Sequence, residues 1–227
     1  VAATSEPGRV VTNGMSQYSR AERNANAGMV VGIEPSDFPQ HDRSAWVAAF
    51  GEADGAVLAD EAQQYAARGE VHPLAGIVLQ RQLESRAFEV GGASYEAPAQ
   101  RVGDFLAARP STQLGGVQPS YKPGIHLTDL AQLLPDYAVT AMREALPAFG
   151  RKIKGYDMAD ALMTAVETRT SSPLRIPRGE AFESPNTPGL YPAGEGASYA
   201  GGILSAGVDG IKVAEAVAKA CAKAVSA

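Results

Sequence analysis

The residues best suited to carrying chemistry form a glycine-rich stretch near the C-terminus. They combine backbone freedom with one carboxylate and open a long amphipathic segment: Gly194, Glu195, Gly196, Ala197, Gly201, Gly202 and Ile203. Apolar residues recur at helical spacing after this point, which predicts a terminal helix. A helix start presents unpaired N–H groups and the positive end of the helix dipole, so the stretch indicates a site for an anionic or electron-rich ligand. The same pattern also suits a terminal helix packed tightly on a sheet.

A second polar cluster lies earlier in the chain, beside a short apolar segment. It contains three hydroxyl residues and two arginines: Thr170, Ser171, Ser172, Arg169 and Arg175. Hydroxyl and guanidinium groups are well suited to holding a carboxylate or a phosphate. Ser-Ser-Pro is equally typical of a turn, where the serine side chains cap the backbone. The residue types therefore leave a ligand-binding role and a turn-forming role both open.

Short runs of apolar and β-branched residues predict the strands that would position these clusters. The expected strands are residues 9–12, 29–33, 163–169, 174–176 and 190–193. Helical spacing and flanking turn residues predict helices at 56–68, 74–90, 98–108, 129–134 and 135–149, and Thr128 is expected to cap the fourth. Gly207 and Gly210 each weaken the terminal helix by roughly 1 kcal/mol relative to alanine, so we expect something to approach its backbone closely.

Composition is that of an ordinary globular domain and narrows the range of partners. The 227-residue chain has a net charge of -5, which argues against nucleic acid or an anionic membrane as a partner. Three histidines and one cysteine are too few for a structural zinc cluster, and no run is long enough to predict a transmembrane helix. A single cysteine excludes an internal disulfide and favours a cytoplasmic location. That residue, Cys221, is expected to be a buried, inert thiol on the apolar face of the terminal helix.

Three motifs carry a resemblance to a known family. Residues 189–197, Gly-Leu-Tyr-Pro-Ala-Gly-Glu-Gly-Ala, resemble the C-terminal flavin-binding segment of two-domain FAD-dependent oxidoreductases. Residues 167–173, Glu-Thr-Arg-Thr-Ser-Ser-Pro, together with residues 189–212 and the Thr-Asn-Gly-Met-Ser run at 12–16, resemble one branch, the predicted FAD-dependent dehydrogenases. The N-terminal G-x-G-x-x-G of that family is absent. The chain therefore looks like the C-terminal half of a longer protein.

The resemblance implies an α/β protein that is represented here by an α+β fragment. Residues 161–227 would form the C-terminal part of an FAD/NAD(P)-binding, Rossmann-like domain. Residues 1–160 would form a largely helical inserted substrate or cap domain with a small sheet. The adenosine-phosphate site would lie in the absent N-terminal strand–turn–helix unit. We therefore expect the chain alone to bind FAD weakly, to be inactive and to self-associate through apolar surface.

The resemblance also implies roles for the two polar clusters. Glu195 would hydrogen-bond a ribityl or ribose hydroxyl of FAD, although an acid is also favoured there simply by the nearby helix N-terminus. The glycines at 194, 196, 201 and 202 would bring backbone N–H groups near the flavin, and Ile203 would pack near its ring. The hydroxyls of Thr170, Ser171 and Ser172 would contact the flavin edge.

The function implied is that of an FAD-dependent dehydrogenase acting on a small molecule. NAD(P)H or another electron donor would be its partner, and the flavin would carry the redox chemistry. No competing hydrolase, zinc-protease or P-loop motif occurs in the chain. The alternative is a non-catalytic nucleotide-binding module, or an RNA- or protein-interaction module, that retains the flavoprotein fold.

Overall fold

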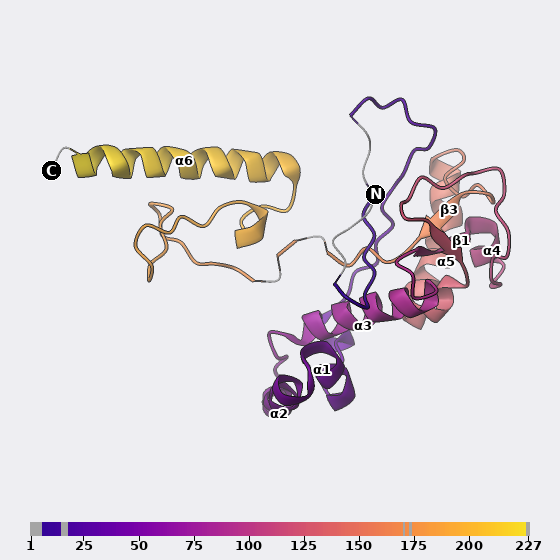
Figure 1. The fold of residues 1–227 in the computed structure, drawn as a ribbon, viewed down its shortest axis with the longest axis horizontal. Helices are drawn as coiled ribbons and strands as arrows, with labels where there is room; N and C mark the ends of the chain where they lie inside the picture. The colour runs from indigo at the N-terminus through magenta and orange to yellow at the C-terminus, as the bar shows by residue number, and fades with distance from the viewer. Residues whose placement is uncertain (1–5, 15–17, 170, 173, 226–227) are drawn as a thin grey trace. The chain divides into compact units, whose positions relative to one another are not determined.

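The computed structural model describes residues 6–14, 18–169, 171–172 and 174–225, and it divides the chain into two units (Figure 1). Unit one is Val1–Thr168 and unit two is Arg169–Ala227. The elements are those of an α+β protein, rich in helix and with a small sheet, as expected for the fragment. Assignment of the two parts to a substrate domain and an FAD-binding domain stays a prediction.

The first half of unit one is a helical layer. Its elements are η1 (Pro35–Asp37), α1 (Arg43–Phe50), α2 (Glu52–Ala67) and α3 (Ala75–Val90). Asp42 caps α1, because its carboxylate accepts from the Ala45 N–H at 3.1 Å. Helix α2 then packs so closely on α1 that a Cβ at Gly55 would lie 2.6 Å from the Trp46 carbonyl oxygen. The fully buried Trp46 is the centre of this helical core.

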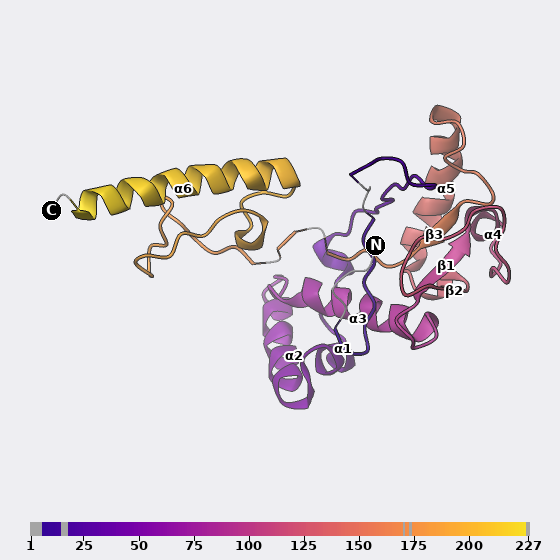
Figure 2. The same ribbon diagram turned by 45° about the horizontal axis from the view of Figure 1, so that its top comes forward.

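The second half of unit one is built on a three-stranded sheet (Figure 2). Strand β1 (Ala97–Arg101) lies in the middle, parallel to β2 (Ile125–Leu127) and antiparallel to β3 (Leu162–Thr164). Helix α4 (Val102–Leu106), η2 (Leu130–Gln132) and α5 (Asp136–Lys152) complete this half. Their buried side chains form a second core, which includes Phe105, Leu130 and Val139.

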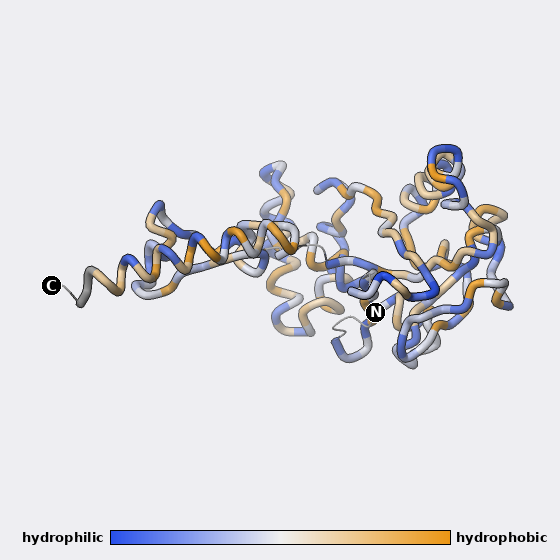
Figure 3. The backbone as a smooth tube through the Cα atoms, turned by 90° about the horizontal axis from the view of Figure 1, so that it is seen from above, coloured by the Kyte–Doolittle hydropathy of each residue, from blue (hydrophilic) through white to orange (hydrophobic). Residues whose placement is uncertain are grey.

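Unit two contains two elements within the residues described: η3 (Glu195–Ala197) and α6 (Ile203–Val225). The segment from 174 to 194 is irregular and packs beside α6, with Val213 among the residues that α6 buries. Figure 3 shows the strongest hydrophobic colouring of α6 in its N-terminal half. Four large apolar residues of that half are nevertheless exposed: Ile203, Leu204, Val208 and Ile211.

Several predicted strands are wrong. Residues 9–12 contribute a single bridge at Thr12, and 29–33, 174–176 and 190–193 are irregular. The expected strand at 163–169 shortens to β3. Leu174 is 60% exposed and Leu190 is 43% exposed, so neither is the buried strand residue that its apolar type indicated. A short apolar run becomes a strand only where a neighbour offers a ladder of hydrogen bonds, and unit two offers none among its described residues.

The helix predicted at 98–108 is also wrong in its first half, which forms β1. Pro98 is tolerated in this middle strand because the bonds to the β2 side use the N–H of Ala97 and the carbonyl of Ala99 instead. The expected cap Thr128 is replaced by Asp129, whose carboxylate accepts from the Ala131 N–H at 3.0 Å. The helices predicted at 56–68, 74–90, 135–149 and from residue 203 are confirmed.

Two expectations about α6 are corrected. Cys221 is exposed rather than buried. Among the described residues, nothing outside the backbone of the helix itself lies within 4 Å of a Cβ built at Gly207 or Gly210, so the expected close approach is not found there. Within the described residues, none of the helices is long and apolar enough to cross a membrane.

Candidate functional site

Arg178 organises unit two around the glycine-rich stretch. Its guanidinium donates two hydrogen bonds to the Asp209 carboxylate, at 2.6 and 2.9 Å, and one to the Pro192 carbonyl at 2.7 Å. The same carboxylate accepts from the Gly194 N–H at 2.8 Å. Asp209 lies on α6, so its hydrogen bond with Gly194 connects the beginning of the glycine-rich stretch to the helix that follows. Bidentate arginine–carboxylate pairs are rigid and specific in geometry.

The ring of Tyr199 packs against the Arg178 guanidinium. The Arg178 guanidinium carbon lies 3.7 Å from the centre of the Tyr199 ring, and the Arg178 N–H donates to the Tyr199 hydroxyl at 3.0 Å. Arg175 approaches the same ring at 4.6 Å. One arginine and one tyrosine therefore hold the irregular segment before α6 in place. Sequence reasoning considered Arg175 only as a ligand contact and did not consider Arg178.

The charges of this pair are mutually stabilised. The hydrogen bonds from Arg178, and then that from Gly194, lower the pKa of Asp209 to about 2. The Asp209 carboxylate in turn raises the pKa of Arg178. Both side chains are largely buried. Asp209 therefore stays ionised at any pH near neutrality, and its negative charge is directed at Arg178 and Gly194.

The first half of the predicted site is structured by these contacts. Gly194 is buried with φ 66°, a left-handed conformation that suits glycine. Residues 195–197 form η3, in which Glu195 is exposed and Ala197 is buried. The Ala197 carbonyl accepts from the Ile176 N–H at 3.4 Å. Glu195 and Gly196 thus lie at the surface on a fixed turn.

The second half of the predicted site is open. Gly201 and Gly202 are exposed, and a Cβ built at Gly201 would meet nothing within 4 Å. Ile203 is 88% exposed. The first backbone hydrogen bond into α6 runs from the Ala206 N–H to the Gly202 carbonyl at 2.8 Å, so the amides before it have no partner within the helix.

The hydroxyl cluster follows the turn alternative where it is described. Ser172 Oγ donates to the Leu174 carbonyl at 2.9 Å and lies 3.3 Å from the Leu174 N–H, while Ser171 is exposed. Thr170 and Pro173 lie outside the described residues. Ser172 Oγ thus serves its own backbone, which leaves Ser171 as the described hydroxyl open to a ligand. Convergence of this segment with the start of α6 on one site stays a prediction.

Two of the motifs that carry the family resemblance meet in unit one. The Thr12 N–H donates to the Val166 carbonyl at 2.8 Å, and Asn13 Nδ2 donates to the Glu167 carboxylate at 3.3 Å. The Val10 N–H donates to the Glu84 carbonyl of α3 at 2.9 Å. The first and last segments of unit one are therefore held side by side. Nothing in their spacing along the chain predicts this pairing.

Glu84 is the residue of this junction that sequence reasoning missed. Its side chain is fully buried, and its Oε1 accepts from Thr168 Oγ1 at 2.7 Å and from Gln80 Nε2 at 2.9 Å. A signal was present in the sequence. Gln80 and Glu84 occupy helical spacing with Ile77 and Ala87, which places a carboxylate on the buried side of α3.

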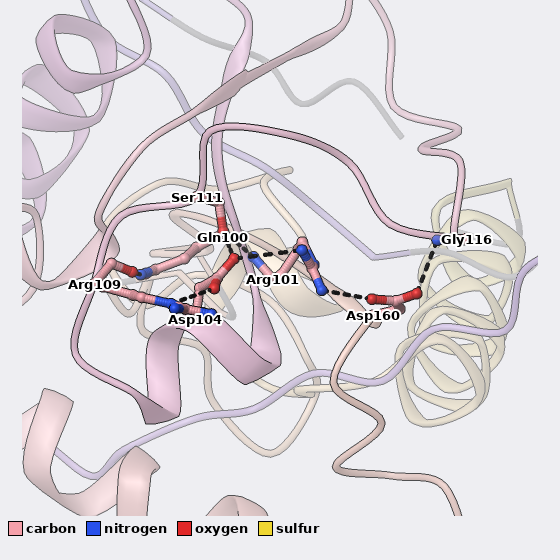
Figure 4. Close-up of polar contacts among 7 residues, drawn as sticks. All are labelled: Gln100, Arg101, Asp104, Arg109, Ser111, Gly116 and Asp160. Atoms are coloured by element: carbon pink, nitrogen blue, oxygen red, sulfur yellow. Dashed lines mark hydrogen bonds and ion pairs between the residues drawn. The ribbon is translucent and has the colours of Figure 1, made fainter.

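A second polar network, buried at Asp104 and Ser111 and more exposed at Asp160, fixes the loop that follows α4 (Figure 4). Arg101 donates to Asp160 at 2.7 Å and lies 3.8 Å from Asp104, while Asp160 accepts from the Gly116 N–H at 2.9 Å. The Ser111 hydroxyl donates to Asp104 at 2.8 Å, which is the main cause of the lowered pKa of Asp104. Asp160 also has a lowered pKa, chiefly because of Gly116. This network holds residues 109–116 against β1.

A cleft of about 610 Å³ lies on unit one between α1, α3 and the start of α5. Its wall carries Arg86 but also Glu89 and Asp136, together with apolar residues such as Leu83 and Leu134. Charges of both signs therefore line it. The cleft has the size of a small-molecule site, but its charge selects no class of ligand.

Comparison with known proteins decides the family. The model of the family described as "FAD-dependent protein, C-terminal domain-like" matches residues 1–53 and 49–170. The chain belongs to this family. The match covers unit one, including the contacts of Thr12 and Asn13 with Val166 and Glu167, and ends at residue 170. FAD is the cofactor of this family of proteins, as the resemblance implied.

A relative extends the comparison across both units. An uncharacterized protein of Clostridium beijerinckii (strain ATCC 51743 / NCIMB 8052) is 46% identical over 215 residues. The alignment covers 95% of this chain and 35% of the relative, so the chain spans about a third of that protein's length.

The residues at the start of α6 fit an FAD molecule in chemical terms. Open glycines permit close approach of a planar group, and the unpaired amides at the N-terminus of a long helix favour electron-rich atoms. The exposed Glu195 carboxylate accepts hydrogen bonds from hydroxyl groups of a sugar or ribityl chain.

Proposed function

We propose that the whole protein is an FAD-dependent oxidoreductase of the dehydrogenase type. Its substrate would be a small molecule, and NAD(P)H or another electron donor would be its redox partner. Unit two would be the C-terminal part of an FAD-binding, Rossmann-like domain, and unit one would be the inserted substrate domain. The family match and the open glycine-rich start of α6 support this proposal.

The chain's own residues would bind and orient the cofactor. The N–H groups around Gly201 and Gly202 would face electron-rich atoms, and Glu195 would accept from a hydroxyl. The positive end of α6 favours negative charge beside it, which stabilises a reduced, anionic form of a nearby group. When bound, FAD supplies hydride and single-electron chemistry that no protein side chain provides.

The Arg178–Asp209 pair would act indirectly. By accepting from Gly194, Asp209 fixes the conformation of the turn on which Glu195 lies. Its charge is neutralised by Arg178 and is therefore not repulsive toward an electron-rich ligand at the helix start. This pair would give the binding stretch a rigid first half and leave its second half free to meet the ligand.

The observation that carries the proposal is the unobstructed start of α6 in a chain of an FAD-dependent family. The test uses the full-length protein loaded with FAD. Under anaerobic conditions, NADH and NADPH are added separately and bleaching of the flavin absorbance band is followed. Bleaching by either donor within seconds supports an oxidoreductase. A different result would favour the non-catalytic nucleotide-binding alternative. In that case the protein would hold one FAD per molecule, neither donor would reduce it, and after reduction by dithionite it would pass no electrons to any of a panel of acceptors.

A further inference from the structure

Arg175 carries a positive charge that no acid balances within the part of the chain that the structure describes. Its side chain is exposed, and its guanidinium carbon lies 4.6 Å from the centre of the Tyr199 ring. It takes part in no ion pair with a described residue. Arg178, which contacts the same ring, is by contrast neutralised by Asp209. Of the two arginines on this ring, Arg175 is therefore the one whose charge is open to a ligand.

The ring that Arg175 contacts is fixed in place. The Tyr199 N–H donates to the Gly194 carbonyl at 3.0 Å, and the Tyr199 hydroxyl accepts from the Arg178 N–H at 3.0 Å. The Arg178 guanidinium packs on the same ring at 3.7 Å and is itself held by Asp209. A cation over an aromatic ring is attracted to the ring's electrons. Contact with this fixed ring therefore restricts where the Arg175 guanidinium lies before any ligand binds.

Arg175 lies beside the glycine-rich stretch. The Ile176 N–H, one residue further along the chain, donates to the Ala197 carbonyl of η3 at 3.4 Å. Tyr199 itself follows η3 and precedes the open start of α6. The exposed acid of η3, Glu195, forms no ion pair with Arg175, so each of the two side chains is available for a contact of its own. All of these residues belong to unit two.

The guanidinium group of Arg175 selects a class of ligand. It is planar, always charged and rich in N–H donors, which match the oxygens of a carboxylate or a phosphate. Restricting the side chain in advance reduces the conformational entropy that is lost when such a ligand binds. The phosphates of FAD are expected at the G-x-G-x-x-G unit, which this chain lacks. An oxyanion bound at Arg175 therefore belongs to another molecule.

We propose that the substrate of the protein is a small carboxylic acid or phosphate ester, and that Arg175 binds its oxyanion beside the stretch that would meet the flavin. The inference rests on the proposed function and narrows its substrate to anionic molecules. Tyr199 is a positioning residue in this assignment, because it restricts the guanidinium without touching the ligand. Binding of the acid weakens as salt is added, because Arg175 is exposed.

The test titrates the full-length, FAD-loaded protein with oxalate and, separately, with inorganic phosphate at constant ionic strength. Calorimetry measures binding, and the flavin absorption band reports an anion that lies near the flavin. We expect at least one of the two anions to bind and to shift the band, and the tighter of the two indicates whether the substrate's acid is a carboxylate or a phosphate. If neither anion binds, or if binding leaves the band unchanged, the proposal is wrong.

Three substitutions assign the binding to Arg175. Arg175→Met removes the charge and the donors and should raise the anion dissociation constant about tenfold or more. Arg175→Lys keeps the charge but loses the planar fork, so its loss should be smaller. Lys219→Met removes an exposed cation of α6 and is the control for net charge, so it should leave anion affinity unchanged. Equal anion affinity in the Arg175→Met and Lys219→Met variants would overturn the role of Arg175.

Measurements without added anion separate a substrate contact from a cofactor contact. Arg175→Met should then hold FAD as tightly as the parent protein and show the same flavin band. Weaker FAD binding or a shifted band would make Arg175 a contact of the cofactor and contradict the substrate assignment. A parent protein that holds FAD but is reduced by no donor contradicts the oxidoreductase proposal, while the anion titrations remain readable. Anion binding through Arg175 in a protein that holds no FAD contradicts the proposed function and leaves Arg175 as an anion-binding residue.

Discussion

At the scale of single residues, Glu195 is the side chain with the most direct expected effect on the cofactor. In the full-length protein, Glu195→Ala removes an ionised hydrogen-bond acceptor from an exposed, fixed turn. A hydrogen bond to a charged group contributes about 1.5–3 kcal/mol, so FAD affinity should fall roughly ten- to a hundredfold. Titration of the apo-protein with FAD measures this.

The matched control is Glu180→Ala, which removes another exposed acid of unit two outside the glycine-rich stretch. It should leave FAD affinity unchanged, and both variants should melt at the temperature of the parent protein. Equal affinity of the Glu195 and Glu180 variants would remove Glu195 from the binding site.

Asp209 gives a prediction about pH. Its pKa in the folded protein is lowered from 3.8 to about 2, so its contribution to the stability of unit two is fully present above pH 4. That contribution is lost as the pH falls through about 2, because protonation removes the ion pair with Arg178. An NMR titration of the Asp209 carboxyl carbon should show this low midpoint.

The Asp209→Asn variant is the companion measurement for the same ion pair. Amide exchange at Gly194 should become faster in this variant at neutral pH, because the amide loses a charged acceptor. Slow exchange at Gly194 in the variant would show that the turn does not depend on the carboxylate.

At the scale of elements, two glycines in helices are expected to respond oppositely to the same substitution. Gly55→Ala forces a Cβ to within 2.6 Å of the Trp46 carbonyl, where only backbone can yield, so unit one should lose about 1–3 kcal/mol of stability. Gly207→Ala adds a Cβ in open space and should stabilise α6 by roughly 1 kcal/mol. Denaturant unfolding and helix content by circular dichroism report the two effects. The same sign for both would contradict the packing described here.

Helices could be predicted from this sequence better than strands, for a physical reason. The hydrogen bonds of α3 and α5 are local, and helical spacing of apolar residues indicates where they form. The strands depend on partners far along the chain, as in the pairing of Ala99 with Thr164. Runs such as 190–193 have the composition of a strand but no neighbour to pair with. Pro98 argued for a helix start and instead lies in the central strand.

Residue types and the resemblance indicated where a cofactor site would lie, and that position stays a prediction; they did not indicate the contacts that support this stretch. The glycines and Glu195 were indicated by residue type and by resemblance; Gly201 and Gly202 are exposed, whereas the Gly194 N–H already donates to Asp209. The Arg178–Asp209 ion pair could not be predicted, because Arg178 lies in an irregular segment and its distance from Asp209 along the chain follows no helical or strand spacing. Glu84 could have been found, because it is a carboxylic acid on the apolar face of a predicted helix. Only a search for ionisable residues on such faces would have singled it out.

At the scale of the whole molecule, the exposed apolar face of α6 should govern how the chain behaves in solution. Ile203 and Leu204 are more than four-fifths exposed, at 88% and 86%, and Ile211 is 62% exposed. We expect the 227-residue chain to self-associate at micromolar concentration, because this apolar face is exposed to solvent. Light scattering should show a mass above that of the monomer.

Substitutions on the exposed apolar face of α6 test whether this face causes the self-association. Ile203→Ser combined with Ile211→Ser should return the chain to a monomer, whereas Val57→Ser, at an exposed apolar residue of α2, should not. A parent chain that stays monomeric would contradict the expected association.

The contact between residues 10–13 and residues 166–167 has a consequence for the order in which unit one folds. Asn13 and Glu167 are separated by 154 positions, whereas α1 and α2 are joined through a single glycine. Loops of this length close late, because their entropy must be overcome before the contact contributes. During synthesis, residues 10–13 leave the ribosome well before β3 and cannot dock until β3 has emerged. The helical core around Trp46 would therefore form first, and residues 10–13 would dock among the last parts of unit one although they precede that core in the chain.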